Sequence, residues 1–307
     1  MTKEKIYLLS PKKHSPEVIA VAFAKTSRSP LSFQEIADEL SDESSAEFHE
    51  KWVVGYGHAS VAEHAVLHIA IENISRLAIE SIQSNRLASY TEKSTRYQKW
   101  DLNAFVTPPE LDGHPLKSEY KNTIKLLFKT YADSLAPTRA IIQERFPRKE
   151  GEADEAWDRR IRARYVDACR FLLPAASHAN VGMTANARVL ESAIRKMLSH
   201  PLAEVRQIGE KIKDAAQNEV PTLVKYAEAV PYFNEVEKEF TALSKSCCAP
   251  TPYSGSDVKM LDHDPLAENK ILAAAIYRFG ENSFSQALQY IESLDTEERA
   301  EIAEKLL

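Results

Sequence analysis

A strand-like run that leads directly into a helix constrains the fold of this chain more than any other feature. Val66–Glu72 alternates apolar residues onto one face, which is typical of a half-buried strand. A helix is expected from Ser75, so Ser84–Arg86 would lie at its C-terminal end. We therefore expect a sheet with helices packed against it, and a polar stretch where this helix ends.

That polar stretch, Ser84–Tyr97, contains two arginines, one glutamate and five Ser or Thr hydroxyls within fourteen residues. Arginine offers planar, paired donors that match a phosphate group. Hydroxyls and backbone N–H groups can complete such a cradle. The composition indicates a ligand with phosphate and sugar groups, and we expect the stretch to run as a loop.

The overall composition bounds the remaining function classes. The 307 residues are 44% hydrophobic and include only 8 glycines and 15 prolines, which favours a folded chain with an ample core. The net charge of -6 gives no overall attraction to nucleic acid, and no run of about 18 apolar residues predicts a membrane span. Cys169, Cys247 and Cys248 form no disulfide framework, and no Cys/His spacing predicts a metal site. We therefore expect a cytoplasmic protein without bound metal.

Helical patterns divide the chain into a main domain, a linker and an appendage. We expect helices over 16–25, 31–40, 116–145, 157–172, 186–199 and 202–218, and in the appendage over 266–280, over 283–294 and from Asp295 onward. Ser32 with Glu35, and Asp295 with Glu298, have the spacing of capping boxes. We assign residues 1–230 to the main domain, 231–265 to a linker and 266–307 to a helical appendage.

The appendage has apolar stripes for which we expect a partner surface. One stripe comprises Ile271, Ala275 and Phe279, and a second comprises Ala287, Ile291 and Leu294. The last expected helix runs to the final residue without a polar tail. We therefore expect either that the chain continues in a longer protein or that this end docks on a partner.

Three further polar blocks lie upstream and downstream of Ser84–Tyr97. His58–His64 alone resembles a solvated helical turn, and its spacing does not place its His and Glu residues on one metal-binding face. Arg170–Pro174, followed by Asn186–Arg188, alone indicates an amphipathic helix with solvated arginines. His200–Arg206 is the third block.

Together with Ser84–Tyr97, these blocks resemble the flavin-dependent thymidylate synthases in order and spacing, over about residues 15–230. The signature of that family is Arg-His-Arg, seven residues, then Ser, usually followed by Arg-Tyr. In this chain Arg86 occupies the third position, and Ser94 and Arg96 follow at the family spacing. Ser84 and Asn85 replace the first Arg and the His.

The resemblance implies a role for each retained position. Further replacements fall on Ser81 and Thr91, and Lys196 stands where the family has an arginine that binds phosphate. By position, the implied groups are Ser94 and His58 in catalysis, Glu92, Ser94, Arg96, Arg170 and Lys196 in substrate binding, and Ser60, Glu63, Arg86, Asn186 and Arg188 in cofactor binding.

The resemblance also implies an α+β fold, a mixed sheet with surrounding helices, in a homotetramer or in a pairing with a second similar domain. The implied reaction is the reductive methylation of dUMP to dTMP. FAD would be the cofactor, and its binding would be weakened by the replacements at Ser84 and Asn85. NADPH and methylenetetrahydrofolate would be cosubstrates. The class needs no cysteine nucleophile, which agrees with cysteines that lie outside every block.

Two alternatives stay open because the replaced residues cluster at functional positions. One is a degenerate, non-catalytic copy with a structural or regulatory role, which the loss of the Arg-His pair favours. The other is a flavoenzyme that acts on a different pyrimidine nucleotide, which the retained Ser94, Arg96 and Arg170 favour.

Overall fold

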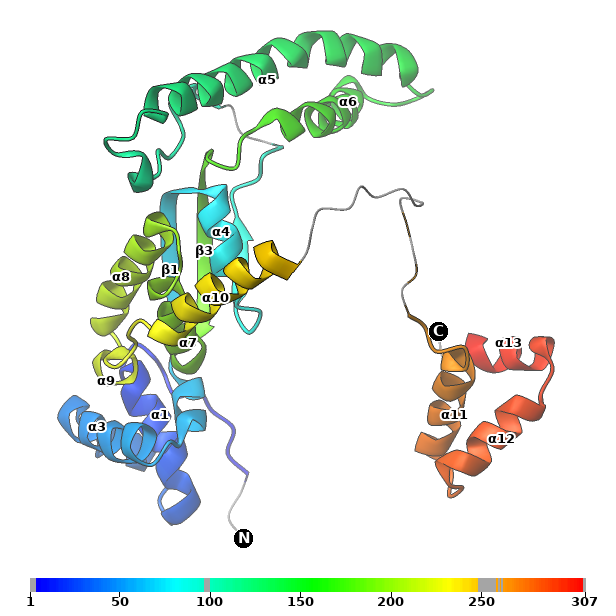
Figure 1. The fold of residues 1–307 in the computed structure, drawn as a ribbon. Coiled ribbons are helices and arrows are strands. Elements are labelled where there is room, and N and C mark those ends of the chain that lie inside the picture. Colours follow the sequence, from blue (N-terminus) through cyan, green and yellow to red (C-terminus); the bar gives the residue numbers. More distant parts are fainter. Residues whose placement is uncertain (1–3, 97–99, 248–257, 259, 261, 306–307) are drawn as a thin grey trace. The chain divides into compact units, whose positions relative to one another are not determined.

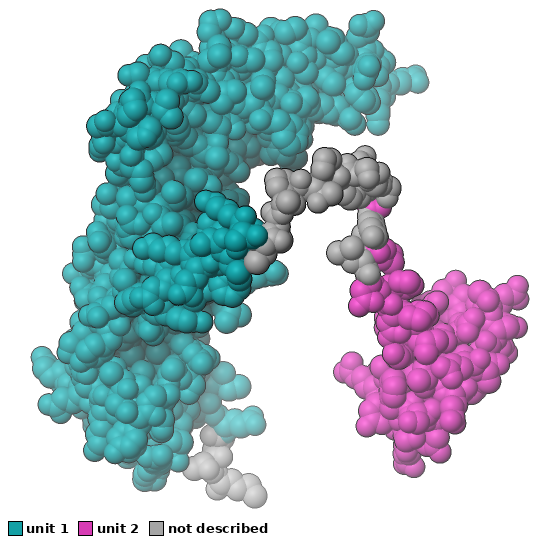
Figure 2. Space-filling view, viewed as in Figure 1, with its two compact units in different colours: residues 1–246 teal, residues 247–307 magenta. Residues whose placement is uncertain are grey.

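The chain forms two compact units, residues 1–246 and residues 247–307 (Figures 1 and 2). The computed structural model describes residues 4–96, 100–247, 258, 260 and 262–305. Tyr97 of the signature and Cys248 lie outside the described residues, as does most of the expected linker after Cys247.

The first unit is mainly helical around a small sheet (Figure 1). Its helices are α1 (Pro16–Lys25), α2 (Phe33–Asp38), α3 (Asp42–Phe48), α4 (Arg76–Gln83), α5 (Lys117–Arg145), α6 (Asp154–Cys169), α7 (Ala187–Leu198), α8 (Ala203–Gln217), α9 (Pro221–Val224) and α10 (Pro231–Cys247). Shorter turns are η1 (Thr26–Arg28), the π-helical η2 (His49–Gly55), η3 (Ala59–His64), η4 (Pro109–Leu111) and η5 (Arg170–Leu172). The strands are β1 (Val66–Ser75), β2 (Ser89–Glu92) and β3 (His178–Asn186).

The sheet has the order β1-β3-β2, and both described pairings are antiparallel. The α+β class is confirmed, although the sheet is antiparallel in these pairings rather than mixed. The central strand β3 was not among the sequence-based expectations. It begins before the helix expected at 186–199, which starts at Ala187. Part of the signature that was expected to be a loop forms β2, because Ser89–Glu92 pairs with β3.

The main core lies between the sheet and three helices. Alternate residues of β3, such as Val181 and Met183, are buried in one cluster with Ile79 of α4, Leu190 of α7 and Ile212 of α8. The strand period of two and the helix period of about 3.6 therefore direct these apolar residues to one core. As a result, residues that follow α4 and residues at the start of α7 line one cavity.

Ser75 fixes the start of α4 against α8. Its backbone N–H donates to Glu204 Oε1 at 2.7 Å, and its hydroxyl donates to Glu204 Oε2 at 2.7 Å. The same hydroxyl accepts the backbone N–H of Ala78 at 3.0 Å as the N-cap of the helix. Because α4 leads into the signature, this contact determines where the signature begins.

Most expected helices are confirmed within a few residues, and both capping boxes are present. The structure differs from expectation at 231–265, which we assigned to a linker. There α10 occupies the first part and belongs to the first unit. Its Tyr232, Phe233, Val236 and Phe240 follow helical rather than linker patterning. Among the described helices, none is long and apolar enough to span a membrane.

The second unit contains α11 (Ala267–Phe279), α12 (Phe284–Ser293) and α13 (Thr296–Glu304). Leu272, Ala273, Ala287 and Ile291 form its buried core. The expectation that the Ala287–Ile291 stripe needs a partner surface is wrong, because α11 and α13 already supply one. Ile271, by contrast, remains 63% exposed.

Candidate functional site

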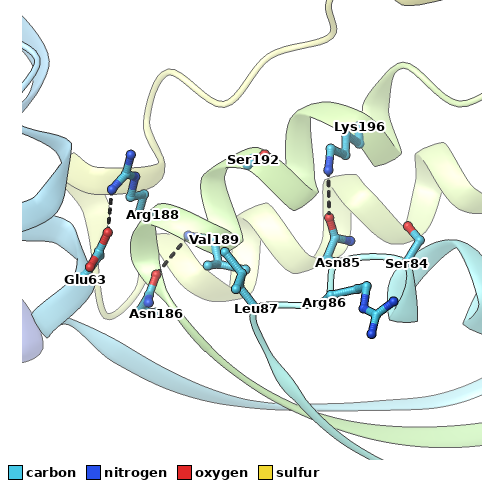
Figure 3. A pocket seen from close by; sticks show the side chains of 10 residues that line it. All are labelled: Glu63, Ser84, Asn85, Arg86, Leu87, Asn186, Arg188, Val189, Ser192 and Lys196. Atoms are coloured by element: carbon cyan, nitrogen blue, oxygen red, sulfur yellow. Dashed lines mark hydrogen bonds and ion pairs between the residues drawn. The ribbon is translucent and has the colours of Figure 1, made fainter. Parts of the chain in front are cut away.

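A cavity of about 560 Å³ lies between the end of α4 and the first turns of α7 (Figure 3). This volume is within the range of about 300–1,000 Å³ that is usual for small-molecule sites. All of its lining residues except Leu87 and Val189 have polar or charged side chains; the lining comprises Glu63, Ser84, Asn85, Arg86, Leu87, Asn186, Arg188, Val189, Ser192 and Lys196. The replaced positions Ser84 and Asn85 and the retained position Arg86 therefore face the same space.

At one end of the cavity, η3 and α7 are joined by an ion pair. Arg188 donates to Glu63, and the two side chains point toward each other (Figure 3). Asn186 is the N-cap of α7, and its side-chain oxygen accepts the backbone N–H of Val189 at 2.9 Å. These contacts bring three residues of two separate sequence blocks to one wall.

At the other end, Asn85 is only 6% exposed and already has partners on both sides. Its Nδ2 donates to the Ile82 carbonyl at 3.0 Å, and its Oδ1 accepts from Lys196 Nζ at 3.4 Å (Figure 3). Ser84 donates its hydroxyl to the Ser81 carbonyl at 2.7 Å. Lys196, implied to bind substrate, therefore lines the same cavity as residues implied to bind the cofactor.

The charges of the lining favour an anion. Arg86, Arg188 and Lys196 are cationic, and Glu63 is the only acidic residue among the ten lining residues. Among the described residues, Arg86 has no hydrogen-bond or ion-pair partner, and it is exposed. Guanidinium and ammonium donors grouped in this way suit a phosphate or diphosphate.

A second cationic cluster forms where the signature meets the end of α6. Arg96 donates through Nε and Nη2 to the two carboxylate oxygens of Asp167, at 2.7 Å and 2.9 Å. Arg170 Nε lies 3.1 Å from Asp167 Oδ1, and its Nη1 donates to the buried Thr95 hydroxyl at 3.3 Å. Hydrogen bonding to Arg96, assisted by the Arg170 charge, holds the pKa of Asp167 below its usual range.

Ser94 and Glu92 lie in the stretch that leads to this cluster. The Ser94 hydroxyl accepts the backbone N–H of Arg96 at 3.2 Å. Glu92, at the end of β2, forms an ion pair with Arg76 at 3.1 Å. The structure thus brings Ser94 next to Arg96 in a local turn, whereas Glu92 is engaged with α4.

His58 and Ser60 lie at η3. The His58 imidazole packs against Trp52, with ring centroids 5.9 Å apart, and helps to line a separate hollow of about 530 Å³. Arg28 also lies over the Trp52 ring, 5.5 Å from its centroid. Ser60 is exposed and does not line either hollow.

The residues implied by the sequence thus occupy three places rather than one. Glu63, Arg86, Asn186, Arg188 and Lys196 share the cavity, Ser94, Arg96 and Arg170 gather near Asp167, and His58 lies beside Trp52. The sequence analysis did not identify Asp167. A carboxylate three residues before Arg170 on a helix could have indicated an ion pair with that arginine. No group of His, Cys, Asp and Glu residues that could hold a metal ion occurs in the described part of the chain.

Comparison with known proteins points to one family. Residues 8–222 match the model of the family described as "Thymidylate synthase complementing protein". A UPF0159 protein of Chlamydia pneumoniae is 27% identical over 327 residues, which cover 95% of this chain. That match covers 62% of the Chlamydia protein, so this chain spans under two thirds of its length.

Proteins named for an activity are also similar. A flavin-dependent thymidylate synthase of Clostridium tetani is 29% identical over 217 residues, covering 69% of this chain and 82% of that protein. The solved structure of the flavin-dependent thymidylate synthase ThyX of Helicobacter pylori, complexed with FAD and dUMP, is 18% identical. It superimposes with a TM-score of 0.46 and covers 70% of this chain and 95% of that chain.

Proposed function

We propose that this chain, which belongs to the thymidylate synthase complementing protein family, binds FAD and dUMP and methylates the nucleotide reductively to dTMP. The observation that supports this most is the cationic cavity at the start of α7. It combines Arg86, Arg188 and Lys196 with the capping residue Asn186. The arginine cluster at Asp167 supplies a second anion-binding group.

FAD fits the donor set of the cavity. Its diphosphate would be held by Arg86 and Arg188, and Lys196 would add a third positive charge. The Glu63 carboxylate would keep Arg188 oriented through their ion pair. Ser84 and Asn85 would contribute less than charged residues, because their polar groups already bond to backbone carbonyls.

dUMP would be recognised through its phosphate. Arg96 and Arg170 approach one carboxylate from two different segments, which shows that their guanidinium groups can meet around one anionic group. Ser94 would position the pyrimidine or the phosphate from the same turn, and Glu92 would orient the sugar or the flavin. The phosphate charge would supply much of the nucleotide affinity.

When bound, FAD reduced by NADPH would supply the hydride, and methylenetetrahydrofolate would supply the one-carbon unit. His58 would lie near the flavin, from its position at the start of η3. Cys169 would take no part, because it is buried on α6, where its thiol donates to the Ser134 carbonyl at 3.6 Å. The chain's own residues would bind, orient and shield the reactants.

Assembly would complete the site. The cavity and the arginine cluster share no lining residue, so two copies of the chain, or a second similar domain, would place one beside the other. We propose a homotetramer or such a domain pairing, in a cytoplasmic setting. Light scattering that gives only the 34.5 kDa mass of a single chain at micromolar concentration would contradict this.

A non-catalytic, nucleotide-binding copy is the second candidate. The observation that favours it is that Ser84 and Asn85, which line the cavity, carry no charge and donate to the carboxyl-terminal carbonyls of α4. An enzyme for a different pyrimidine nucleotide would share the arginine cluster and differ in product.

FAD binding tests the proposal. We expect added FAD to give a perturbed visible spectrum with the wild-type protein, and to dialyse away slowly. Arg188→Met should weaken FAD binding by about 1.5–3 kcal/mol, because one charge-assisted contact is lost. Lys211→Met, which removes an exposed lysine of α8 outside the cavity, is the matched control and should bind like wild type. Failure of the wild-type protein to bind FAD would refute the proposal.

A further inference from the structure

We infer that Asp167 is a positioning residue that holds Arg96 and Arg170 together for the phosphate of the nucleotide. This inference rests on the proposed function. It assigns a role to a residue outside every sequence block, and it concerns how the two phosphate-binding arginines are held in place.

The contacts of Asp167 are specific to both arginines. Both of its oxygens accept from Arg96, at 2.7 Å and 2.9 Å, in a bidentate pair. Oδ1 also lies 3.1 Å from Arg170 Nε. One carboxylate therefore fixes the planes of two guanidinium groups at once.

Two contacts bring these arginines together, the shared carboxylate of Asp167 and the hydrogen bond from Arg170 to Thr95, the neighbour of Arg96. Arg96 follows β2, and Arg170 begins η5 after α6, so the two belong to segments 74 positions apart. Two neighbouring cations repel each other and have long, flexible side chains. Asp167 offsets the repulsion and leaves the three-residue cluster with a net charge of one positive, which still favours a phosphate dianion.

One donor group of Arg170 remains for a ligand. Its Nε lies against Asp167 and its Nη1 donates to Thr95, whereas its Nη2 has no partner among the described residues. Thr95, which is 8% exposed, anchors Arg170 from the other side. Asp167 contacts Arg170 through Nε alone and leaves its Nη2 for a phosphate, which favours positioning over competition with the phosphate.

The charge of Asp167 is maintained around neutral pH. The hydrogen bond from Arg96 is the largest effect and holds the pKa of Asp167 below its usual range. Burial opposes this hydrogen bond, and the charges of Arg170 and Arg96 lower the pKa further. The charged groups that contact this carboxylate are the guanidinium groups of Arg96 and Arg170. The arrangement is therefore stable across the pH range in which nucleotide binding is measured.

The test compares dUMP with deoxyuridine, which lacks the phosphate, by calorimetry and ligand-observed NMR on the full chain. We expect Asp167→Asn to weaken dUMP binding by about 10-fold or more, as for loss of a charge-assisted contact, and to leave deoxyuridine binding unchanged. Asp167→Glu, which keeps the charge, should recover most of the dUMP affinity.

Asp158→Asn is the matched control. Asp158 lies on the same helix, and it accepts from Arg139 at 2.6 Å in a similar Asp–Arg pair away from the cluster. This variant should bind both ligands like wild type. Unchanged or tighter dUMP binding by Asp167→Asn, or weaker binding by Asp167→Glu than by Asp167→Asn, would overturn the inference while leaving the proposed function standing. Absence of dUMP binding by the wild-type protein would instead overturn the proposed function itself.

Discussion

Removing the Glu204 carboxylate should loosen the helix that leads into the cavity. Glu204 accepts two hydrogen bonds from Ser75, each 2.7 Å long, and Ser75 is only 2% exposed. Glu204→Ala would leave the Ser75 backbone N–H buried without its acceptor. A buried donor without a partner costs most of its desolvation free energy.

The magnitude follows from the number and environment of these bonds. Two hydrogen bonds to a charged group contribute about 1.5–3 kcal/mol each. Because Glu204 itself is partly exposed, we take the lower end and expect a loss of about 3 kcal/mol in the free energy of unfolding. In a unit of this size, that corresponds to a fall in Tm of roughly 6–12 °C.

Thermal unfolding followed by circular dichroism measures the change. Glu210→Ala is the matched control, because Glu210 is an exposed glutamate on the same helix α8. It should shift Tm by no more than about 2 °C, as expected for a surface substitution. Equal Tm values for the two variants would refute the stabilising role assigned to the Ser75–Glu204 contact.

Two further predictions concern protonation and the replaced signature residues. Burial, and to a smaller extent the Arg206 charge, lowers the pKa of His200 against the raising effect of Glu237. Its Nδ1 accepts from the Leu202 N–H at 3.1 Å, which requires a neutral ring. The contribution of neutral His200 to the free energy of unfolding should be fully present above about pH 6.5. It should decline as the pH falls from that value toward the lowered pKa of the folded state, because the unfolded chain then binds more protons. Urea unfolding should show a shallower pH dependence for His200→Gln than for wild type, and equal slopes would contradict this. The double change Ser84→Arg with Asn85→His should tighten FAD binding by about 1.5–3 kcal/mol per restored charged contact and raise dTMP formation. If the folded variant binds FAD no more tightly than wild type, these two positions do not limit FAD binding.

Local patterns predicted most helices of this fold, because the signals that define helices lie close together in sequence. The Ser32–Glu35 and Asp295–Glu298 boxes mark helix starts that the structure confirms. The central strand β3 was missed, although Val181 and Met183 alternate with polar or small residues as a strand requires. Its inward positions include small alanines, which weakens the apolar pattern that strands usually show. The helix α10 was missed because a shift in composition near residue 231 was interpreted as the start of a linker.

The family resemblance proposed the candidate site residue by residue, but not as an arrangement. It named Glu63, Arg86 and Arg188, and the structure brings these three to one cavity. Sequence spacing could not show that Lys196 shares this cavity, nor that Asp167 joins two arginines, because these contacts connect distant segments. Which residues meet is determined by the packing of α4, α6 and α7 around the sheet, and this information is not local.

Formation of dTMP tests the proposed function most directly. The full chain, supplied with FAD, dUMP, NADPH and methylenetetrahydrofolate, should produce dTMP in step with NADPH oxidation, as resolved by chromatography. Arg96→Ala should reduce the rate at subsaturating dUMP by about 10-fold or more, because a phosphate contact is lost. A protein that binds both FAD and dUMP, yet forms no dTMP, would contradict catalysis by this chain and support the non-catalytic alternative.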